Sequence, residues 1–395
     1  MIRVLLVPSS DYLGHPFLQR HNQIFERLHD GKNFEVHVVR FRLFNRPELS
    51  TRVVVHELND VRGRSAASYY LINMVNHASE IRRIVRQEGI DVVVLANLAP
   101  AFAYTLMEDL SRMRVPVVFD LPDYFPTSAS GYVCDVRSLR GRLLTEAFSL
   151  MLGYMMRRAV AVTAASHALV EYARGVGAHV ALRVPNGISE HFLKLSDGNA
   201  LREKLGFGLE HVVVGYVGSV EFWLDMRSLV EGLALLRKRD VDAKLLIVGR
   251  RLHTDYSERV MGWIRRKDLE RDTVWLDFVP HDVVPEYMAA LDVGTIPFDV
   301  CDPTAYYSAP NKMWEYLSQL KPVVSTGIPE ALCNRDCALI VSTPQDYAEA
   351  LGFVAERESH VFEGVKIGYS RALSKTWDRS VRQFATVLNS VCLKS

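Results

Sequence analysis

A lysine and a glutamate three positions apart stand at the start of a helical pattern in the segment SAPNKMWEYLSQLKPVVST, residues 308–326. The pattern begins after Pro310, so Lys312 falls in the first helical turn and Glu315 one turn further on. The positive end of the helix dipole disfavours a cation in that turn. We therefore expect an anion from outside the chain beside Lys312, where the N–H groups of a helix N-terminus also attract negative charge. The alternative is a solvated lysine next to an ordinary helix-start acid.

Two aspartates end an apolar run in the first half of the chain, where VVFDLPDYFPTS contains Asp120 and Asp123. A carboxylate at the end of a strand can act as a general base that accepts the proton of an attacking hydroxyl group. Asp123 is the less constrained by the strand. The alternative is that an aspartate caps the turn beside Pro122. A further loop, PSSDYLGHPF, brings Gly14 and His15 to the end of the first apolar run.

Short apolar runs rich in β-branched residues alternate with helical patterns along the whole chain. The runs span residues 2–8, 34–41, 91–97, 115–121, 159–166, 179–187, 212–219, 243–249, 273–279, 292–298, 321–326 and 338–342. Runs of this kind are typical of strands buried on both faces, and the alternation with helices predicts a parallel, doubly wound sheet.

A polar interval at residues 195–211 separates two series of such runs, and 395 residues suit two domains. We predict an N-terminal Rossmann-like domain over 1–195, a second one over 196–370, and a C-terminal helix over 371–395 that packs back on the first domain. The two domains are expected to face each other across a cleft. Ligands of parallel sheets bind beyond the carboxyl ends of the strands, where all the residues named above fall.

Composition excludes several classes of protein. Lysine and arginine number 47 against 46 aspartates and glutamates, which argues against a nucleic-acid partner. Five scattered cysteines indicate reduced thiols and no disulfide framework. No apolar stretch is long enough to span a membrane. The nearest to such a length, Leu143 to Met156, is broken by Glu146 and flanked by arginines, and it fits either a buried helix or a membrane-surface patch. We expect a cytoplasmic protein, with the inner face of the membrane as the alternative location.

The second half of the chain resembles the donor-binding domain of a GT-B glycosyltransferase. The resemblance rests on YVGSVEFWLD, LLIVGRR, VWLDFVPHDVVPEYMAALDVGTIPF and APNKMWEYLSQLKPVVST. It is strongest to family 4 and to the related bacterial exopolysaccharide glucuronosyltransferases. The first half is similar to the end of their N-terminal domain in AVTAASHALVEYA and VPNGISEHF.

This resemblance implies a nucleotide diphosphate sugar as donor, with the diphosphate beside Lys312 and the ribose hydroxyls on Glu315. Backbone at Gly218 and Ser219 would approach the ligand closely, and Phe278 would form a wall of the base site or remain a core aromatic. The residues expected to bind the donor are Gly14, Gly218, Ser219, Phe278, Tyr307, Ser308, Asn311, Lys312 and Glu315.

The chain departs from the family at two places. The first of the two family glutamates is replaced by Tyr307, which we expect to line the sugar pocket instead. The arginine and lysine that usually follow YVGS are replaced by VEFWLD, which contains Trp223 and Asp225. Lys312 is therefore expected to carry most of the phosphate-binding charge, without a metal ion or other cofactor. Asp240 and Asp242 precede a strand, at the wrong edge of the sheet for a metal-dependent donor site.

The sequence thus predicts a glycosyltransferase that moves a sugar from its donor to a hydroxyl of a glycan or lipid-linked acceptor. Two alternatives remain: a nucleotide-sugar 2-epimerase of the same fold, and a non-catalytic two-domain sugar-binding protein. An epimerase calls for several acids and histidines around the donor sugar, and a diphosphate lysine is foreign to a simple sugar binder. Asp120 and Asp123 are the candidates for the catalytic base if the reaction inverts configuration.

Overall fold

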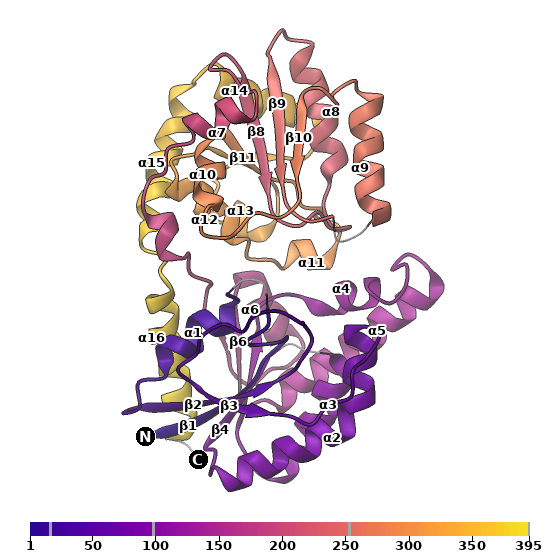
Figure 1. Ribbon diagram of the computed structural model, residues 1–395, viewed down its shortest axis with the longest axis vertical. Coiled ribbons are helices and arrows are strands. Elements are labelled where there is room, and N and C mark those ends of the chain that lie inside the picture. Colours follow the sequence, from indigo (N-terminus) through magenta and orange to yellow (C-terminus); the bar gives the residue numbers. More distant parts are fainter. Residues whose placement is uncertain (16–17, 97–98, 252–253, 394–395) are drawn as a thin grey trace. The chain divides into compact units, whose positions relative to one another are not determined.

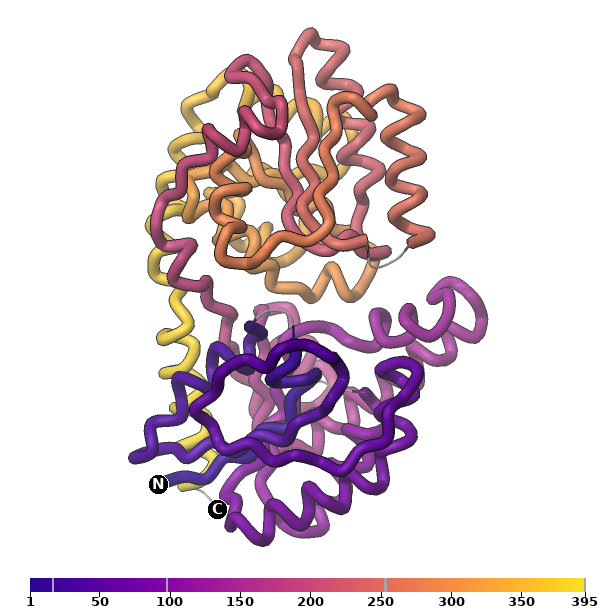
Figure 2. Tube along the Cα trace, in the orientation of Figure 1, coloured from indigo at the N-terminus to yellow at the C-terminus, as the bar shows by residue number. Residues whose placement is uncertain are grey.

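The computed structural model describes residues 1–15, 18–96, 99–251 and 254–393, and it consists of two compact units (Figure 1). The first unit comprises Met1–Asn186, Tyr307–Ala309 and Trp377–Ser395. The second comprises Gly187–Tyr306 and Pro310–Thr376. The course of the chain through each unit can be followed in Figure 2.

The first unit is built on a seven-stranded sheet in the order β3-β2-β1-β4-β5-β6-β7, and every neighbouring pair is parallel. Its strands are β1 (Ile2–Val7), β2 (Phe34–Arg40), β3 (Val54–Glu57), β4 (Val92–Ala96), β5 (Val117–Leu121), β6 (Ala161–Ala164) and β7 (Ala181–Arg183). Its helices are α1 (Arg20–Leu28), α2 (Ala66–Gln87), α3 (Pro100–Arg112), α4 (Phe125–Gly131), α5 (Leu139–Arg158), α6 (His167–Gly175) and α16 (Trp377–Cys392).

Helices cover both faces of this sheet. In β1, Leu5 and Val7 join a core formed with α2, α3, α5 and α6. Val4 and Leu6 point the other way, into a core formed with α1 and α16. Successive side chains of a strand point to opposite faces, so a strand that is apolar at every position is buried in two layers.

The second unit holds a six-stranded parallel sheet in the order β10-β9-β8-β11-β12-β13. Its strands are β8 (Val212–Val217), β9 (Ala243–Val248), β10 (Thr273–Leu276), β11 (Val293–Ile296), β12 (Val323–Thr326) and β13 (Leu339–Val341). Its helices are the 3-10 helix η1 (Glu190–Leu193), α7 (Asn199–Lys204), α8 (Met226–Arg237), α9 (Thr254–Arg266), α10 (Val284–Ala289), α11 (Pro303–Tyr306), α12 (Asn311–Ser318), α13 (Pro329–Leu332), α14 (Pro344–Ala355) and α15 (Ser359–Leu373). The predicted pair of doubly wound parallel sheets is confirmed.

The connection after Asn186 belongs to the second unit, whereas the sequence placed the domain boundary at residue 196. The reason is the buried side chain of Gln319, at the end of α12. Its Nε2 donates to the backbone oxygens of Phe192 (3.0 Å) and Lys194 (2.9 Å), and its Oε1 accepts from the Ser196 N–H (2.9 Å). One amide side chain therefore holds this segment against the second unit.

Helix α16 belongs to the first unit, although it follows the second unit in sequence. The Phe384 ring packs edge-on against Phe25 of α1, with ring centroids 5.2 Å apart. Asp378 pairs with Arg27 at 3.3 Å, and the Ser380 hydroxyl donates to the backbone oxygen of Pro185 (2.7 Å). The helix thereby completes the α1 layer of the first sheet.

Candidate functional site

The first turn of α12 carries the lysine that the sequence singled out. Pro310 takes the N-cap position, and its side chain has no atom that could accept a bond from the N–H groups of that turn. Lys312 is half-buried. Its ammonium nitrogen lies 3.1 Å from the Tyr216 hydroxyl oxygen, 4.2 Å from the centre of the Tyr216 ring and 5.3 Å from that of Phe298. Aromatic faces thus hold the cation where the helix dipole opposes it.

Two carboxyl groups share the surroundings of this ammonium. Burial lowers the pKa of Lys312 to about 8, although the charges of Glu315 and Glu221 act in the opposite direction. Burial raises the pKa of Glu221 to about 7 and that of Glu315 to about 7, each against the attraction of Lys312. All three groups therefore change their charge near neutral pH, which is typical of a site that handles charged ligands.

The backbone beside Lys312 is open because β8 ends in a glycine. Gly218 has φ +139°, a conformation that side chains rarely adopt. A Cβ atom there would lie 2.6 Å from the ammonium nitrogen of Lys312. Ser219 follows, and its backbone oxygen accepts a hydrogen bond from the Tyr216 hydroxyl (2.8 Å). The positive φ and the close approach of the lysine both require glycine at 218.

Helix α12 is fixed on the sheet by Tyr316. The Tyr316 hydroxyl accepts a bond from the Val217 N–H at the end of β8 (2.8 Å). Its ring lies over Gly294 of β11, where a Cβ atom would come within 2.3 Å of the ring. Because β8 and α12 are joined in this way, the end of the strand and the start of the helix keep a fixed relation around Lys312.

Phe278 is not a core aromatic, because 45% of its surface is exposed. The guanidinium of Arg250 stacks on its ring at 4.6 Å, and that of Arg251 stacks on Trp275 at 4.4 Å. The Trp275 indole N–H donates to the backbone oxygen of Gly249 (3.0 Å). An exposed aromatic ring with one cation over it is suited to stacking against a planar group.

The structure divides the expected donor residues between the two units. The second unit contains Gly218, Ser219, Phe278, Asn311, Lys312 and Glu315, whereas Gly14, Tyr307 and Ser308 belong to the first. The Tyr307 ring packs against Tyr124 (5.1 Å) and Tyr172 (5.2 Å), and its backbone oxygen accepts from the Ser166 hydroxyl (2.7 Å). The Asn311 amide donates to the backbone oxygen of Gly187 (3.4 Å).

In the first unit, Asp120 is completely buried and bound on both oxygens. It faces the α1 side of the sheet, where the Arg20 guanidinium binds it through two nitrogens, at 3.0 and 3.1 Å. His21 Nε2 lies 3.1 Å away, and the hydroxyl of Thr163, its partner in register on β6, donates at 2.7 Å. Burial acts to raise the pKa of Asp120, but Arg20 and His21 outweigh it and hold the pKa well below its usual range.

Asp123 differs from Asp120 in exposure and in charge state. Its residue is exposed. Desolvation nevertheless raises the pKa of its carboxyl to about 6, with Arg20 opposing the rise and Asp120 adding to it. A carboxyl with such a pKa is ionised at neutral pH and is a stronger base than an ordinary aspartate. Of the two aspartates, Asp123 is therefore the better suited to accept a proton.

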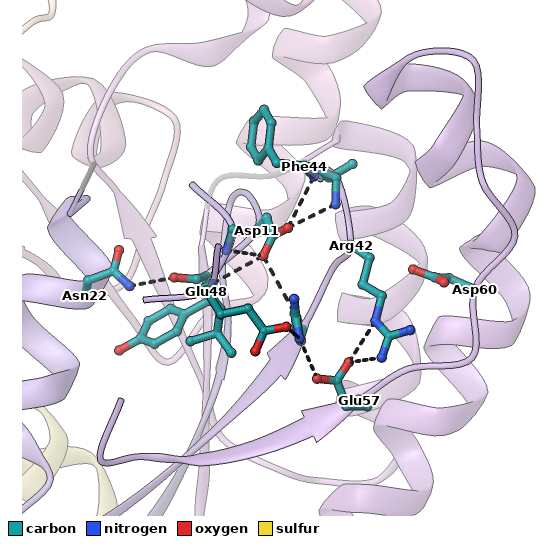
Figure 3. A network of polar contacts seen from close by, with 12 residues as sticks. Asp11, Asn22, Arg42, Phe44, Glu48, Glu57 and Asp60 are labelled. Atoms are coloured by element: carbon teal, nitrogen blue, oxygen red, sulfur yellow. Dashed lines mark hydrogen bonds and ion pairs between the residues drawn. The ribbon is translucent and has the colours of Figure 1, made fainter. Parts of the chain in front are cut away.

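The loop that contains Gly14 is held by Asp11, whose carboxylate is buried within the polar network of Figure 3. Asp11 accepts bonds from the N–H groups of Leu13 (3.2 Å) and Gly14 (2.8 Å) on one oxygen, and of Leu43 (3.2 Å) and Phe44 (3.3 Å) on the other. A Cβ atom on Gly14 would meet this carboxylate at 2.5 Å. The glycine thus lets one aspartate fasten the loop after β1 to the segment after β2.

Sequence reasoning missed Arg20, His21, Asp11 and Glu221. Glu221 could have been found from the sequence, because it places a carboxylate four residues after β8, where the family resemblance leads one to expect positive charge. Asp240 and Asp242 precede β9, and Asp242 is paired with Lys244 (2.8 Å). Asp225 caps α8 by accepting from the Ser228 N–H (3.1 Å).

Among the residues that the structure describes, no three histidine, cysteine, aspartate or glutamate side chains are grouped so as to hold a metal ion. Nor does any helix in the described ranges combine the length and apolar character needed to cross a membrane.

Comparison with known proteins gave matches over both units. The family model described as glycosyl transferases group 1 matches residues 211–356, and that of the glycosyl transferase 4-like domain matches residues 22–187. A Bacillus subtilis (strain 168) protein named as a teichuronic acid biosynthesis glycosyltransferase, TuaH, is 26% identical over 218 residues. This alignment covers 54% of the chain and 51% of TuaH, about half the length of that curated relative.

Solved structures resemble the chain over its full length. Anabaena HepE, crystallised with UDP and glucose, has a TM-score of 0.74 at 18% identity, with 99% of this chain and 100% of HepE covered. The sucrose-phosphate synthase of Thermosynechococcus elongatus has a TM-score of 0.77 at 15% identity, with both chains covered completely. At these identities the likeness establishes the fold.

Replacement of Asp120 by asparagine is expected to lower the free energy of unfolding of the first unit by about 3 kcal/mol, because it leaves the buried Arg20 charge uncompensated. Asp123→Asn, the same change at a carboxyl whose pKa is raised and not lowered by its surroundings, is expected to cost less than about 0.5 kcal/mol. Urea unfolding followed by far-UV circular dichroism measures both. Equal losses would show that the Asp120–Arg20 pair does not stabilise the unit.

Proposed function

Because the chain belongs to the family 4-like glycosyltransferases of the GT-B fold, we propose that it transfers a sugar from a nucleotide diphosphate sugar to an acceptor hydroxyl. The observation that carries the proposal is the Lys312 ammonium in the first turn of α12, beside the open backbone of Gly218. A diphosphate there would meet a cation and the N–H groups of a helix N-terminus together.

Each residue of the second unit has a place in this proposal. Lys312 neutralises the charge that develops on the leaving diphosphate, so the reaction proceeds without a metal ion or other cofactor. Glu315 accepts hydrogen bonds from the ribose hydroxyls, and the exposed ring of Phe278 stacks on the base. The solved relative HepE binds UDP and UDP-glucose, which makes UDP the first nucleotide to test. GDP, ADP, dTDP and CMP derivatives complete the panel.

Lys312→Ala is expected to weaken UDP binding strongly, because the diphosphate loses the cation beside it. A hydrogen bond to a charged group is worth about 1.5–3 kcal/mol, which corresponds to a loss of at least about tenfold in affinity. Calorimetric titration with UDP measures the effect, and an unchanged thermal unfolding midpoint shows that the variant is folded.

Lys366→Ala, which removes an exposed lysine from α15, is the control and is expected to bind UDP like the unaltered protein. Binding of UDP by Lys312→Ala at the original affinity would contradict the proposed donor site.

In the first unit, Asp123 is the proposed general base if the reaction inverts configuration. Asp123→Asn is then expected to bind UDP normally but to stop turnover. In the unaltered protein, kcat/KM is expected to fall about tenfold per pH unit below pH 6, because protonation of the base removes its activity. The assay is release of nucleotide diphosphate with a membrane-lipid extract as acceptor source. Undiminished turnover in both Asp120→Asn and Asp123→Asn would eliminate the proposed base.

A lipid-linked acceptor at the cytoplasmic face of a membrane is part of the proposal. It is supported by the start of α5, where Leu139 (75% exposed) and Leu143 (64% exposed) alternate with the exposed Arg140 and Arg142. Exposed apolar side chains flanked by arginines suit an anionic bilayer surface.

Co-sedimentation with phosphatidylglycerol vesicles is expected for the unaltered protein and much less with phosphatidylcholine vesicles. Leu143→Glu should weaken it, because a carboxylate replaces a buried apolar contact in an anionic surface. Leu209→Glu makes the same change at an exposed leucine of the second unit and should have no effect. Protein that stays entirely in the supernatant with both lipids would contradict the membrane contact.

A further inference from the structure

Glu221 lies in a rigid loop that follows β8, and only 6% of its surface is exposed. Three backbone bonds fix this loop to neighbouring segments. The Val220 N–H donates to the Arg250 oxygen (2.9 Å), the Asp299 N–H to the Trp223 oxygen (2.9 Å), and the Asp225 N–H to the Pro297 oxygen (2.7 Å). A buried carboxyl on so well-anchored a backbone has little freedom to turn out to solvent.

The Tyr216 hydroxyl ties this loop to Lys312. It accepts from the lysine ammonium and donates to the Ser219 oxygen, two residues before Glu221. The charges of Glu221 and Lys312 act on one another, and Glu221 also acts on the ionisation of Tyr216. Three further titratable groups belong to this region. Glu315 lies on the same helix as Lys312. Asp225, which caps α8, and Asp299, which accepts from the Cys301 N–H, border the loop that contains Glu221.

A diphosphate bound beside Lys312 shifts the protonation equilibrium of the Glu221 carboxyl. An ionised carboxylate in a low-dielectric site repels a phosphate of like charge strongly. A protonated carboxyl instead offers an O–H donor, as an acid held neutral in an apolar site does. Burial already brings the pKa of Glu221 to about 7, so protonation at neutral pH requires little free energy.

We propose that Glu221 binds the donor diphosphate as a neutral carboxylic acid, which donates its O–H to a phosphate oxygen and takes its proton from solvent when the nucleotide binds. The proposal rests on the proposed function, since the ligand is the nucleotide diphosphate at Lys312. The protonated carboxyl thus supplies the hydrogen bond to phosphate that a cation would otherwise supply at this position. If Glu221 were only a counter-charge for Lys312, it would stay ionised when the ligand binds.

Proton uptake on UDP binding distinguishes the two cases. Titration calorimetry at pH 8 in buffers of different ionisation enthalpy gives the number of protons taken up per UDP. The terminal phosphate of UDP is already ionised at that pH. With a pKa of about 7, Glu221 is mostly ionised at pH 8, and Lys312, with a pKa of about 8, is only partly charged. Glu221 should therefore take up about one proton on binding, and Lys312 a further fraction of one.

Glu221→Gln is expected to take up about one proton fewer, because its amide donates to phosphate without titrating. Its affinity for UDP should exceed that of the unaltered protein by about tenfold at pH 8 and equal it at pH 6, where Glu221 is already protonated. Glu349→Gln, the same change at an exposed position of α14, is the control and should leave both readouts unchanged.

Lys312→Arg supplies a second measurement that does not depend on folding of the glutamine variant. Arginine does not titrate, so about one proton per UDP should remain, taken up by Glu221. Equal uptake in the unaltered protein and Glu221→Gln, or weaker binding by Glu221→Gln at every pH, would overturn the role of Glu221 alone. Failure of the unaltered protein to bind UDP between pH 6 and 8 would instead overturn both the proposed donor site and the role of Glu221.

Discussion

The contacts at the start of α12 depend on one cation, Lys312, which lies in a poorly solvated position. Lys312 stands where the dipole of α12 disfavours it, and its ammonium is held by the hydroxyl and ring of Tyr216. Two neighbouring positions must be glycine for this arrangement to form. Gly218 must lack a side chain for the ammonium to fit, and Gly294 must lack one so that Tyr316 can fix α12 to the end of β8.

In the first unit, the buried charge of Asp120 is neutralised by directly bonded partners. Asp120 is as deeply buried as any core residue, but a bidentate arginine, a histidine and a threonine hydroxyl satisfy it. A buried pair of this kind adds little net stability compared with apolar packing, yet the loss of one partner is costly. Its clearest consequence is local: Arg20 and Asp120 set opposing fields at Asp123, and desolvation still raises the pKa of Asp123.

The two units together show how similar residues acquire different roles. Asp120 and Asp123 are three positions apart, and the pKa of the first is lowered while that of the second is raised. Glu221 and Glu315 share one lysine, and burial leaves each carboxyl close to its midpoint at neutral pH. Burial sets the direction of a shift unless a directly bonded cation outweighs it.

By itself the sequence determined the two parallel sheets, because continuous apolar runs in alternation with helical patterns are compatible with few other architectures. Of the strands in the described part of the chain, it missed only β3, a four-residue edge strand that is half exposed and therefore lacks a continuous apolar run. It also singled out Lys312 and Glu315, since a cation in a first helical turn conflicts with a local rule. Tertiary structure alone decided that Asp120 is bonded by Arg20 and His21 and that Phe278 is exposed. It also decided that Glu221 is buried in a loop that the Tyr216 hydroxyl links to Lys312. Those facts depend on contacts between residues up to a hundred positions apart, and no local pattern of residue types records them.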